Sequence, residues 1–135
     1  MTEYNLCLAR ETESRELDRG RVLQGVRALL ADGQKGVYYL AETADAVVGQ
    51  LMITREWSDW RNAWFWWIQS VYVREGSRGL GVYRALYTHV KAAAKEDETV
   101  CGIRLYVESE NERAQEVYRR MGMSKSSYQF FELEF

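Results

Sequence analysis

The run AWFWWIQSVYV, residues 63–73, is the longest stretch of β-branched and aromatic residues in the chain. It is apolar at successive positions rather than alternate ones, which is typical of a strand covered on both faces. A chain of 135 residues is long enough to bury such a strand without disulfides or a structural metal. We therefore expect residues 1–135 to form one α/β domain, with helices on the faces of a single sheet.

Apolar spacing predicts the other elements. Strands are expected at residues 4–12, 100–109 and 126–135, and a hairpin at 36–42 and 46–54. Helices are expected at residues 13–33, split by Gly20 and Gly25, then from the glycine-rich loop to about Lys95, and from Asn111 to a stop at Gly122. This order favours a mixed, mostly antiparallel sheet of about six to seven strands with about four flanking helices.

Charge and composition exclude several classes of protein. The net charge of -2 lacks the basic excess of a general nucleic-acid or membrane-surface binder. Cys7 and Cys101 are too few and too far apart for a metal cluster or a disulfide framework, and they fall in strand patterns that predict burial. There is neither an apolar run of ~20 residues nor a signal-peptide core, so we expect a cytoplasmic protein with no metal.

The loop REGSRGLGVYRALY, residues 74–87, places three glycines between the predicted central strand and a predicted helix. Glycines at the start of a helix let an anion approach unpaired backbone N–H groups at the positive end of the helix dipole. The spacing is neither a Walker motif, since Val82 and Tyr83 follow Gly81, nor a Rossmann motif, since residue 84 is arginine. By spacing alone, a glycine turn with no ligand is an equal alternative.

The segment VYVREGSRGLGVYRALY resembles the acetyl-CoA signature of the GNAT superfamily of N-acetyltransferases, Arg/Gln-x-x-Gly-x-Gly/Ala, with Arg78 and Gly81 at its first two defined positions. The segment YVESENERAQEVYRRMGM resembles the part of that family that follows, with Asn111, Ala114, Tyr118 and Gly122 matching in order. The resemblance covers about residues 63–123. It implies a GNAT-like fold, acetyl-CoA as cofactor and a small-molecule or protein amine as acceptor.

The same resemblance implies which residues contact the cofactor: Val71, Val73, Arg78, Gly79, Leu80, Gly81, Val82, Tyr83, Asn111 and Tyr118. Tyr83 departs from the family, in which glycine or alanine is usual. Its ring is expected to pack against Tyr87 one turn later, and the alternative is that it crowds the cofactor. Asn111 is also a good N-cap.

In this family an amine attacks the thioester directly. The resemblance implies a backbone N–H near Val71 for the developing oxyanion and Tyr118 as the general acid for the thiolate. Glu108, Glu110 or a chain of water molecules is expected to accept the amine proton, because Gln69 can orient water but is a poor proton acceptor. His89, in mid-helix, is expected to be structural.

Five tryptophans occur within residues 57–67. They lie where the acceptor site of the resembled fold begins, so Trp57, Trp60, Trp66 and Gln69 are predicted to bind the acceptor, by cation–π contact in the case of a cationic amine. The alternatives are that Trp57 and Trp60 cover the sheet or form a homodimer interface. The sequence is also compatible with two further functions: a non-catalytic CoA-binding regulatory domain, and an interaction module with an aromatic partner surface.

Overall fold

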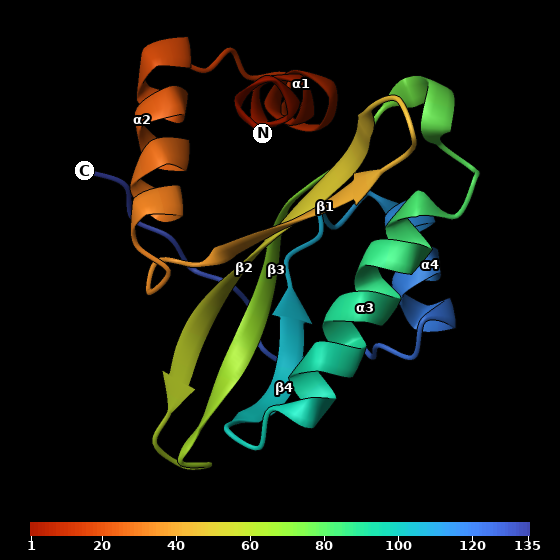
Figure 1. Ribbon diagram of the computed structural model, residues 1–135. Coiled ribbons are helices and arrows are strands. Elements are labelled where there is room, and N and C mark those ends of the chain that lie inside the picture. Colours follow the sequence, from red (N-terminus) through yellow and green to blue (C-terminus); the bar gives the residue numbers. More distant parts are fainter. The chain divides into compact units, whose positions relative to one another are not determined.

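The computed structural model describes residues 1–135. Along the chain it contains helices α1 (Thr2–Glu13) and α2 (Arg19–Ala31), strands β1 (Val37–Glu42), β2 (Val47–Ser58) and β3 (Ala63–Val73), a 3-10 turn η1 (Glu75–Ser77), helix α3 (Val82–Glu96), strand β4 (Val100–Leu105) and helix α4 (Glu112–Arg120) (Figure 1). The contacts within the chain define two compact units, residues 1–105 and 106–135. None of the helices has the length and apolar content that a membrane-spanning helix requires.

The first unit contains the whole sheet, in the order β1-β2-β3-β4. The β1–β2 and β2–β3 pairs are antiparallel and the β3–β4 pair is parallel. The predicted strand 63–73 and the hairpin before it are confirmed, and β3 is central because it pairs on both edges. The sheet is mixed and mostly antiparallel as predicted, and four α-helices are present, but the prediction of six to seven strands is wrong because there are four.

Two predicted strands account for most of the difference. Residues 4–12 lie in α1, where Tyr4, Asn5 and Glu11 all hydrogen-bond to residues of the strands. Tyr4, Asn5 and Glu11 lie on one face of this helix. The alternation of Leu6 and Leu8 is too short to distinguish that helical spacing from a strand. Residues 126–135 form no strand, and Phe131 is 85% exposed. Alternation of apolar residues defines a face for a strand, but it does not supply a partner for the backbone N–H and C=O groups.

The predicted helical segment 13–33 is interrupted at a different place. Gly20 and Gly25 both lie within α2, so the prediction that they split it is wrong. The interruption comes at Ser14, which has a left-handed φ of 52° at the end of α1, and the Asp18 side chain then caps α2 by accepting from the Arg21 N–H. The predicted strand 100–109 ends at Leu105.

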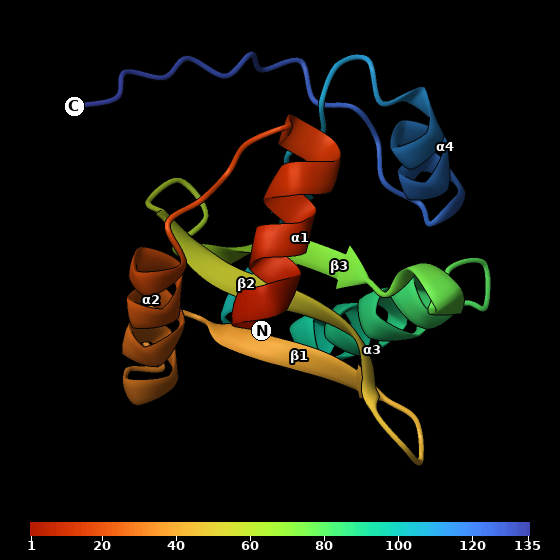
Figure 2. The same ribbon diagram turned by 90° about the horizontal axis from the view of Figure 1, so that it is seen from above.

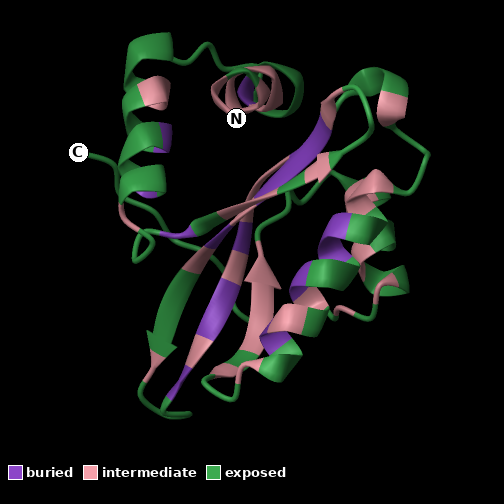
Figure 3. Cartoon of the chain, in the orientation of Figure 1, coloured by how far each residue is buried: buried purple, intermediate pink, exposed green.

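Helices cover both faces of the sheet in the first unit. α1 and α2 lie over one face and α3 over the other (Figures 1 and 2). Strand alternation and the observed contacts place Gln50, Met52 and Thr54 towards α1 and α2. Leu51 lies on the α3 side and is fully buried, and Val90 of α3 is also fully buried. Figure 3 shows buried segments along the central strands and on the side of α3 that faces the sheet.

Candidate functional site

The glycine-rich loop connects β3 to α3 and leaves its backbone accessible. Gly79 and Gly81 have φ of 77° and 82°, and a Cβ built on either would meet no atom within 4 Å. Gly81 is the N-cap of α3 and no side chain caps that helix end. The first N–H groups of a helix have no partner within the helix, so this loop can accept an anion at the positive end of the α3 dipole.

The start of α3 lies close to the sheet because Gly49 of β2 has no side chain. A Cβ at Gly49 would lie 2.7 Å from Cγ1 of Val82 and 3.3 Å from the carbonyl oxygen of Tyr72. Gly49 is paired with Val73, the last residue of β3. The glycine in β2 thus allows the first turn of α3 to approach the end of β3.

Arg78, the first residue of the predicted signature, anchors the loop. Its Nε donates to the carbonyl oxygen of Val73 at 2.9 Å, and its guanidinium pairs with a carboxylate oxygen of Glu11 at 2.5 Å. The other carboxylate oxygen of Glu11 accepts from the Tyr72 hydroxyl at 2.9 Å. The structure therefore connects α1, β3 and the glycine loop through one carboxylate.

The pKa values of this cluster follow from its contacts. The hydrogen bond from Arg78, followed by that from Tyr72, holds the pKa of Glu11 below its usual value. Burial, and then the hydrogen bond to Glu11, raises the pKa of Tyr72 to about 12. Glu11 is therefore ionised and Tyr72 is protonated at neutral pH, the states that the two hydrogen bonds require.

Tyr83 packs as predicted. Its ring lies 6.2 Å from that of Tyr87, between centroids, at an interplanar angle of 39°. The two side chains are one turn apart on α3, and Tyr87 is buried.

Strand β3 is irregular where the resemblance predicts the oxyanion donor. Gln50 pairs with Tyr72 and Met52 with Gln69, so Ser70 and Val71 together oppose one residue of β2. Ser70 has a φ of 50°, and this extra residue is a β-bulge. The role predicted for the Val71 N–H stays a prediction.

A cavity lies on the other face of the sheet, beneath α1 and α2. Its volume is about 360 Å³, within the ~300–1,000 Å³ common for small-molecule sites. Its walls come from α1, α2, the loop after α2 and three strands, and the lining residues are Asn5, Val22, Gly25, Val26, Leu29, Lys35, Tyr38, Met52, Thr54 and Ser70.

The tryptophans predicted to bind the acceptor do not line this cavity. Trp57 packs edge-on against Trp64 at 4.9 Å, Trp60 is 85% exposed in the β2–β3 turn, and Trp66 is buried. Gln69 lies nearer, because its Nε2 donates to Oγ1 of the lining residue Thr54 at 2.7 Å.

The polar side of the cavity was not predicted from the sequence. Asn5 falls within the predicted strand 4–12, and Gln50, which contacts Asn5 without lining the cavity, is the one amide within the apolar run AVVGQLMIT. Gln50 is fully buried and its Nε2 donates to Oδ1 of Asn5 at 2.7 Å. A polar side chain inside an apolar strand pattern was the available signal.

The second unit, residues 106–135, carries the other predicted site residues. Asn111 caps α4, since its Oδ1 accepts from the Ala114 N–H at 3.0 Å, and Gly122 follows the helix with a φ of 86°, so both predicted helix ends are confirmed. Burial raises the pKa of Tyr118, which is half-buried on α4. The carbonyl oxygen of Glu108 accepts from the Asn111 N–H at 3.0 Å. The roles predicted for Tyr118, Glu108 and Asn111 in catalysis and cofactor binding stay predictions.

His89 and the two cysteines do not line the cavity. His89 lies on the surface of α3 with its ring edge-on to Tyr39 at 5.6 Å. Cys101 is exposed, so its predicted burial is wrong, and Cys7 is half-buried.

Comparison with known proteins agrees with this architecture. The model of the Acetyltransferase (GNAT) family matches residues 4–123. A possible acetyltransferase from Clostridium difficile 630 is 44% identical, with a TM-score of 0.93 over 99% of this chain and 88% of its own. A probable acetyltransferase is 22% identical, with a TM-score of 0.85 over 99% of this chain and 89% of its own. No curated protein matches the sequence significantly. With most of its length matched by the family model, the chain belongs to the GNAT family of acetyltransferases.

Proposed function

We propose that the protein transfers an acetyl group from acetyl-CoA to a primary amine by direct attack in a ternary complex. One observation carries this proposal: the glycine loop, whose backbone is accessible to an anion, and the cavity beneath α1 and α2 both adjoin the last residues of β3. Ser70, at the bulge, lines the cavity, and the glycine loop begins directly after Val73. The family supports acetyl transfer in general, and this convergence supports a two-substrate site.

The loop fits the diphosphate of CoA. An accessible backbone at two glycines of positive φ, ahead of an uncapped 15-residue helix, matches an anion with several acceptor oxygens. The residues that would hold the cofactor are Gly79, Leu80, Gly81, Val82 and Tyr83 through their backbone, with Val71 and Val73 along β3. When bound, acetyl-CoA supplies the acyl group as an activated thioester.

The chain's residues have three tasks in this reaction. A C–N bond forms as the C–S bond breaks, one proton leaves the amine nitrogen, and one proton reaches the departing sulfur. The N–H of Val71 donates to the carbonyl oxygen as negative charge develops there. Tyr118, whose pKa is raised by burial, stays protonated at neutral pH and gives its proton to the thiolate. Glu108, or a water molecule oriented by Gln69, takes the amine proton.

Release of free thiol from acetyl-CoA in the presence of a panel of primary amines tests the proposal, with CoA binding followed by calorimetry. We expect saturable binding and amine-dependent thiol release, with the acetylated amine identified by mass spectrometry. Binding without transfer to any amine would instead support a non-catalytic CoA-binding domain. Absence of binding would contradict both functions.

A further inference from the structure

Resting on the proposed acetyl transfer, we propose that the cavity beneath α1 and α2 selects a primary amine with an apolar body and a carboxylate at its far end. Three features of the lining support this class of acceptor: an apolar wall, hydroxyl groups that can donate hydrogen bonds, and one cation without any acidic residue.

The apolar wall is formed mainly by α2. Val22, Val26 and Leu29 recur at the spacing of one helix face, and Val26 and Leu29 are buried. Met52 of β2 also lines the cavity. A ligand body that contacts these side chains gains by removing apolar surface from water, so a flexible polycation or a sugar would use this wall poorly.

A chain of amide hydrogen bonds determines which atoms of the polar wall can donate. Nε2 of Gln50 donates to the carbonyl oxygen of Ser70 at 3.2 Å and to Oδ1 of Asn5 at 2.7 Å. Asn5 therefore presents its NH₂ group to Tyr38, and Nδ2 donates to the Tyr38 hydroxyl oxygen at 3.0 Å. Because that oxygen already accepts, the hydroxyl hydrogen of Tyr38 is available to an acceptor atom of a ligand.

The hydroxyl group of Thr54, like that of Tyr38, accepts a hydrogen bond within the protein and keeps its own hydrogen available. Its Oγ1 accepts from Nε2 of Gln69 at 2.7 Å, which leaves its hydroxyl hydrogen for a ligand. Tyr38 and Thr54 both line the cavity. Two hydroxyl donors on one wall favour a ligand group that accepts hydrogen bonds.

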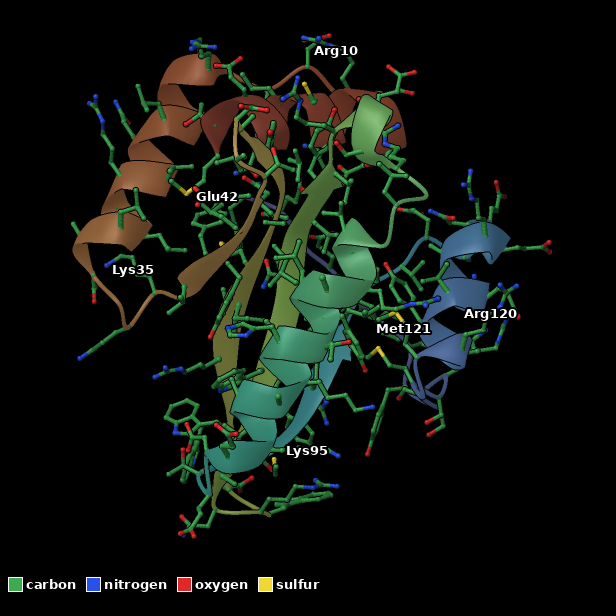
Figure 4. All side chains as sticks on the ribbon, turned by 45° about the vertical axis from the view of Figure 1, so that its right-hand side comes forward. Arg10, Lys35, Glu42, Lys95, Arg120 and Met121 are labelled. Atoms are coloured by element: carbon green, nitrogen blue, oxygen red, sulfur yellow. The ribbon has the colours of Figure 1, made fainter.

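Lys35 is the only charged residue among those lining the cavity. It lies in the loop after α2, as Figure 4 shows, and it pairs with Asp32, which does not line the cavity. Both side chains are about half exposed, and an exposed pair is held weakly, so the ammonium can turn to a ligand carboxylate. A second ammonium on the ligand would meet a like charge and no compensating carboxylate.

The fold also sets the length of the acceptor. Ser70 lies in β3, beside the thioester in the proposed function, whereas Lys35 lies in the loop just before β1 and Tyr38 is the second residue of β1. β2 separates these two strands, and neighbouring strands are ~4.8 Å apart, so the two ends are on the order of 10 Å apart. One aromatic ring, or a chain of similar length, connects an amine and a carboxylate over that distance once the Lys35 side chain reaches inward.

Three matched amines test the proposal: 4-(aminomethyl)benzoate, benzylamine and 1,4-bis(aminomethyl)benzene. Thiol release from acetyl-CoA gives kcat/KM for each. We expect the carboxylate to exceed benzylamine by about tenfold, the lower end of a charged hydrogen bond, and the diamine to be the poorest despite its two amines. Acetylation with no preference, or with a preference for the diamine, would overturn the acceptor class while leaving acetyl transfer intact.

Two lysine variants identify the origin of the preference. Lys35→Gln should bring the carboxylate-to-benzylamine ratio of kcat/KM to about one, because the interaction lost is with the ligand's carboxylate. Lys95→Gln is the matched control, since Lys95 is exposed near the end of α3 on the other face of the sheet (Figure 4). An undiminished ratio in Lys35→Gln would refute the role of Lys35.

A binding measurement separates this inference from the proposed function. If none of the amines is acetylated, the shift in melting temperature caused by each amine tests the cavity alone. Stabilisation by the carboxylate that is lost in Lys35→Gln would support the selectivity even though acetyl transfer had failed. Equal shifts from all three amines, or no shift, would overturn it.

Discussion

Single residues of the glycine loop determine whether an anion can reach the backbone. Gly79 and Gly81 adopt left-handed φ values with open space beside them, whereas Gly76 in the same loop has equally open space without a left-handed φ. A side chain at Gly81 would both strain the backbone and occupy the space in front of the α3 N-terminus. This contrast provides a matched pair of substitutions.

Gly81→Ala should weaken acetyl-CoA binding by tenfold or more, about 1.4 kcal/mol, whereas Gly76→Ala should change it little. Calorimetry on both variants measures the effect, and thermal unfolding shows whether each remains folded. Equal affinity in a folded Gly81→Ala variant would show that the diphosphate does not use this loop.

Tyr118→Phe tests the proposed general acid. The substitution keeps the apolar ring on α4 and removes only the hydroxyl, so stability should be nearly unchanged. The chemical step should slow by ~10²-fold or more, while the Kd for acetyl-CoA should stay the same, because the ground-state thioester needs no proton. Single-turnover kinetics with a responsive amine measures the chemical step. Calorimetry measures the Kd for acetyl-CoA, and the melting temperature reports stability. Unchanged turnover would reduce Tyr118 to a packing residue.

At the scale of elements, α1 is attached to the sheet by polar contacts as well as by packing. Tyr4 donates to the Val47 carbonyl, Asn5 links to Gln50 and Tyr38, and Glu11 accepts from Tyr72 and Arg78. The Glu11 contacts also secure the glycine loop through Arg78. The position of α1 is therefore coupled to the state of one carboxylate.

Glu11→Gln should lower the melting temperature near neutral pH, by an amount that shrinks in acid. The pKa of Glu11 is lowered in the folded protein, so its stabilising contribution is present above the unfolded-state value of ~4.3 and is lost as the pH falls through the folded-state value. Melting temperatures of both proteins from pH 7 to 3 measure this convergence. Glu134→Gln, in the exposed tail, is the control, and a difference that stays constant with pH would rule out the linkage.

At the scale of the whole molecule, binding at the loop should stabilise the folded chain by mass action. At a free concentration about 100 times Kd, acetyl-CoA should add ~2.7 kcal/mol. That corresponds to a rise in melting temperature of about 10 °C for a chain of this size. Differential scanning calorimetry at increasing acetyl-CoA concentration makes the test, and Gly81→Ala should show a smaller rise. A melting temperature that does not depend on acetyl-CoA would contradict binding to the native state.

Local patterns predicted the centre of the fold correctly. The apolar run 63–73 is β3, the two runs before it form the hairpin of β1 and β2, and the helix after the loop is α3, which ends at Glu96. Asn111 and Gly122 bound α4 as predicted. These elements could be predicted because each depends on a short sequence pattern. A strand covered on both faces, a helix cap and a left-handed glycine can each be recognised from a few consecutive residues.

The N-terminal helix and the cavity beneath it could not be predicted in the same way. Leu6 and Leu8 alternate over too short a stretch to distinguish a strand from a helix, and α1 becomes evident only through its contacts with β1, β2 and β3. The five tryptophans between residues 57 and 67 do not line the cavity, and the role predicted for Trp57, Trp60 and Trp66 in acceptor binding stays a prediction.

The sequence by itself determined the α/β class, the central strand, the glycine loop ahead of α3 and the resemblance to acetyltransferases, since each depends on residues that are neighbours along the chain. Only the tertiary structure decided where the cavity lies. Asn5, Lys35 and Ser70 line one cavity although they are separated by up to 65 positions. Their meeting depends on strand register, on the bulge at Ser70 and on the packing of α1 and α2, and these arise from contacts between distant segments that no local pattern records.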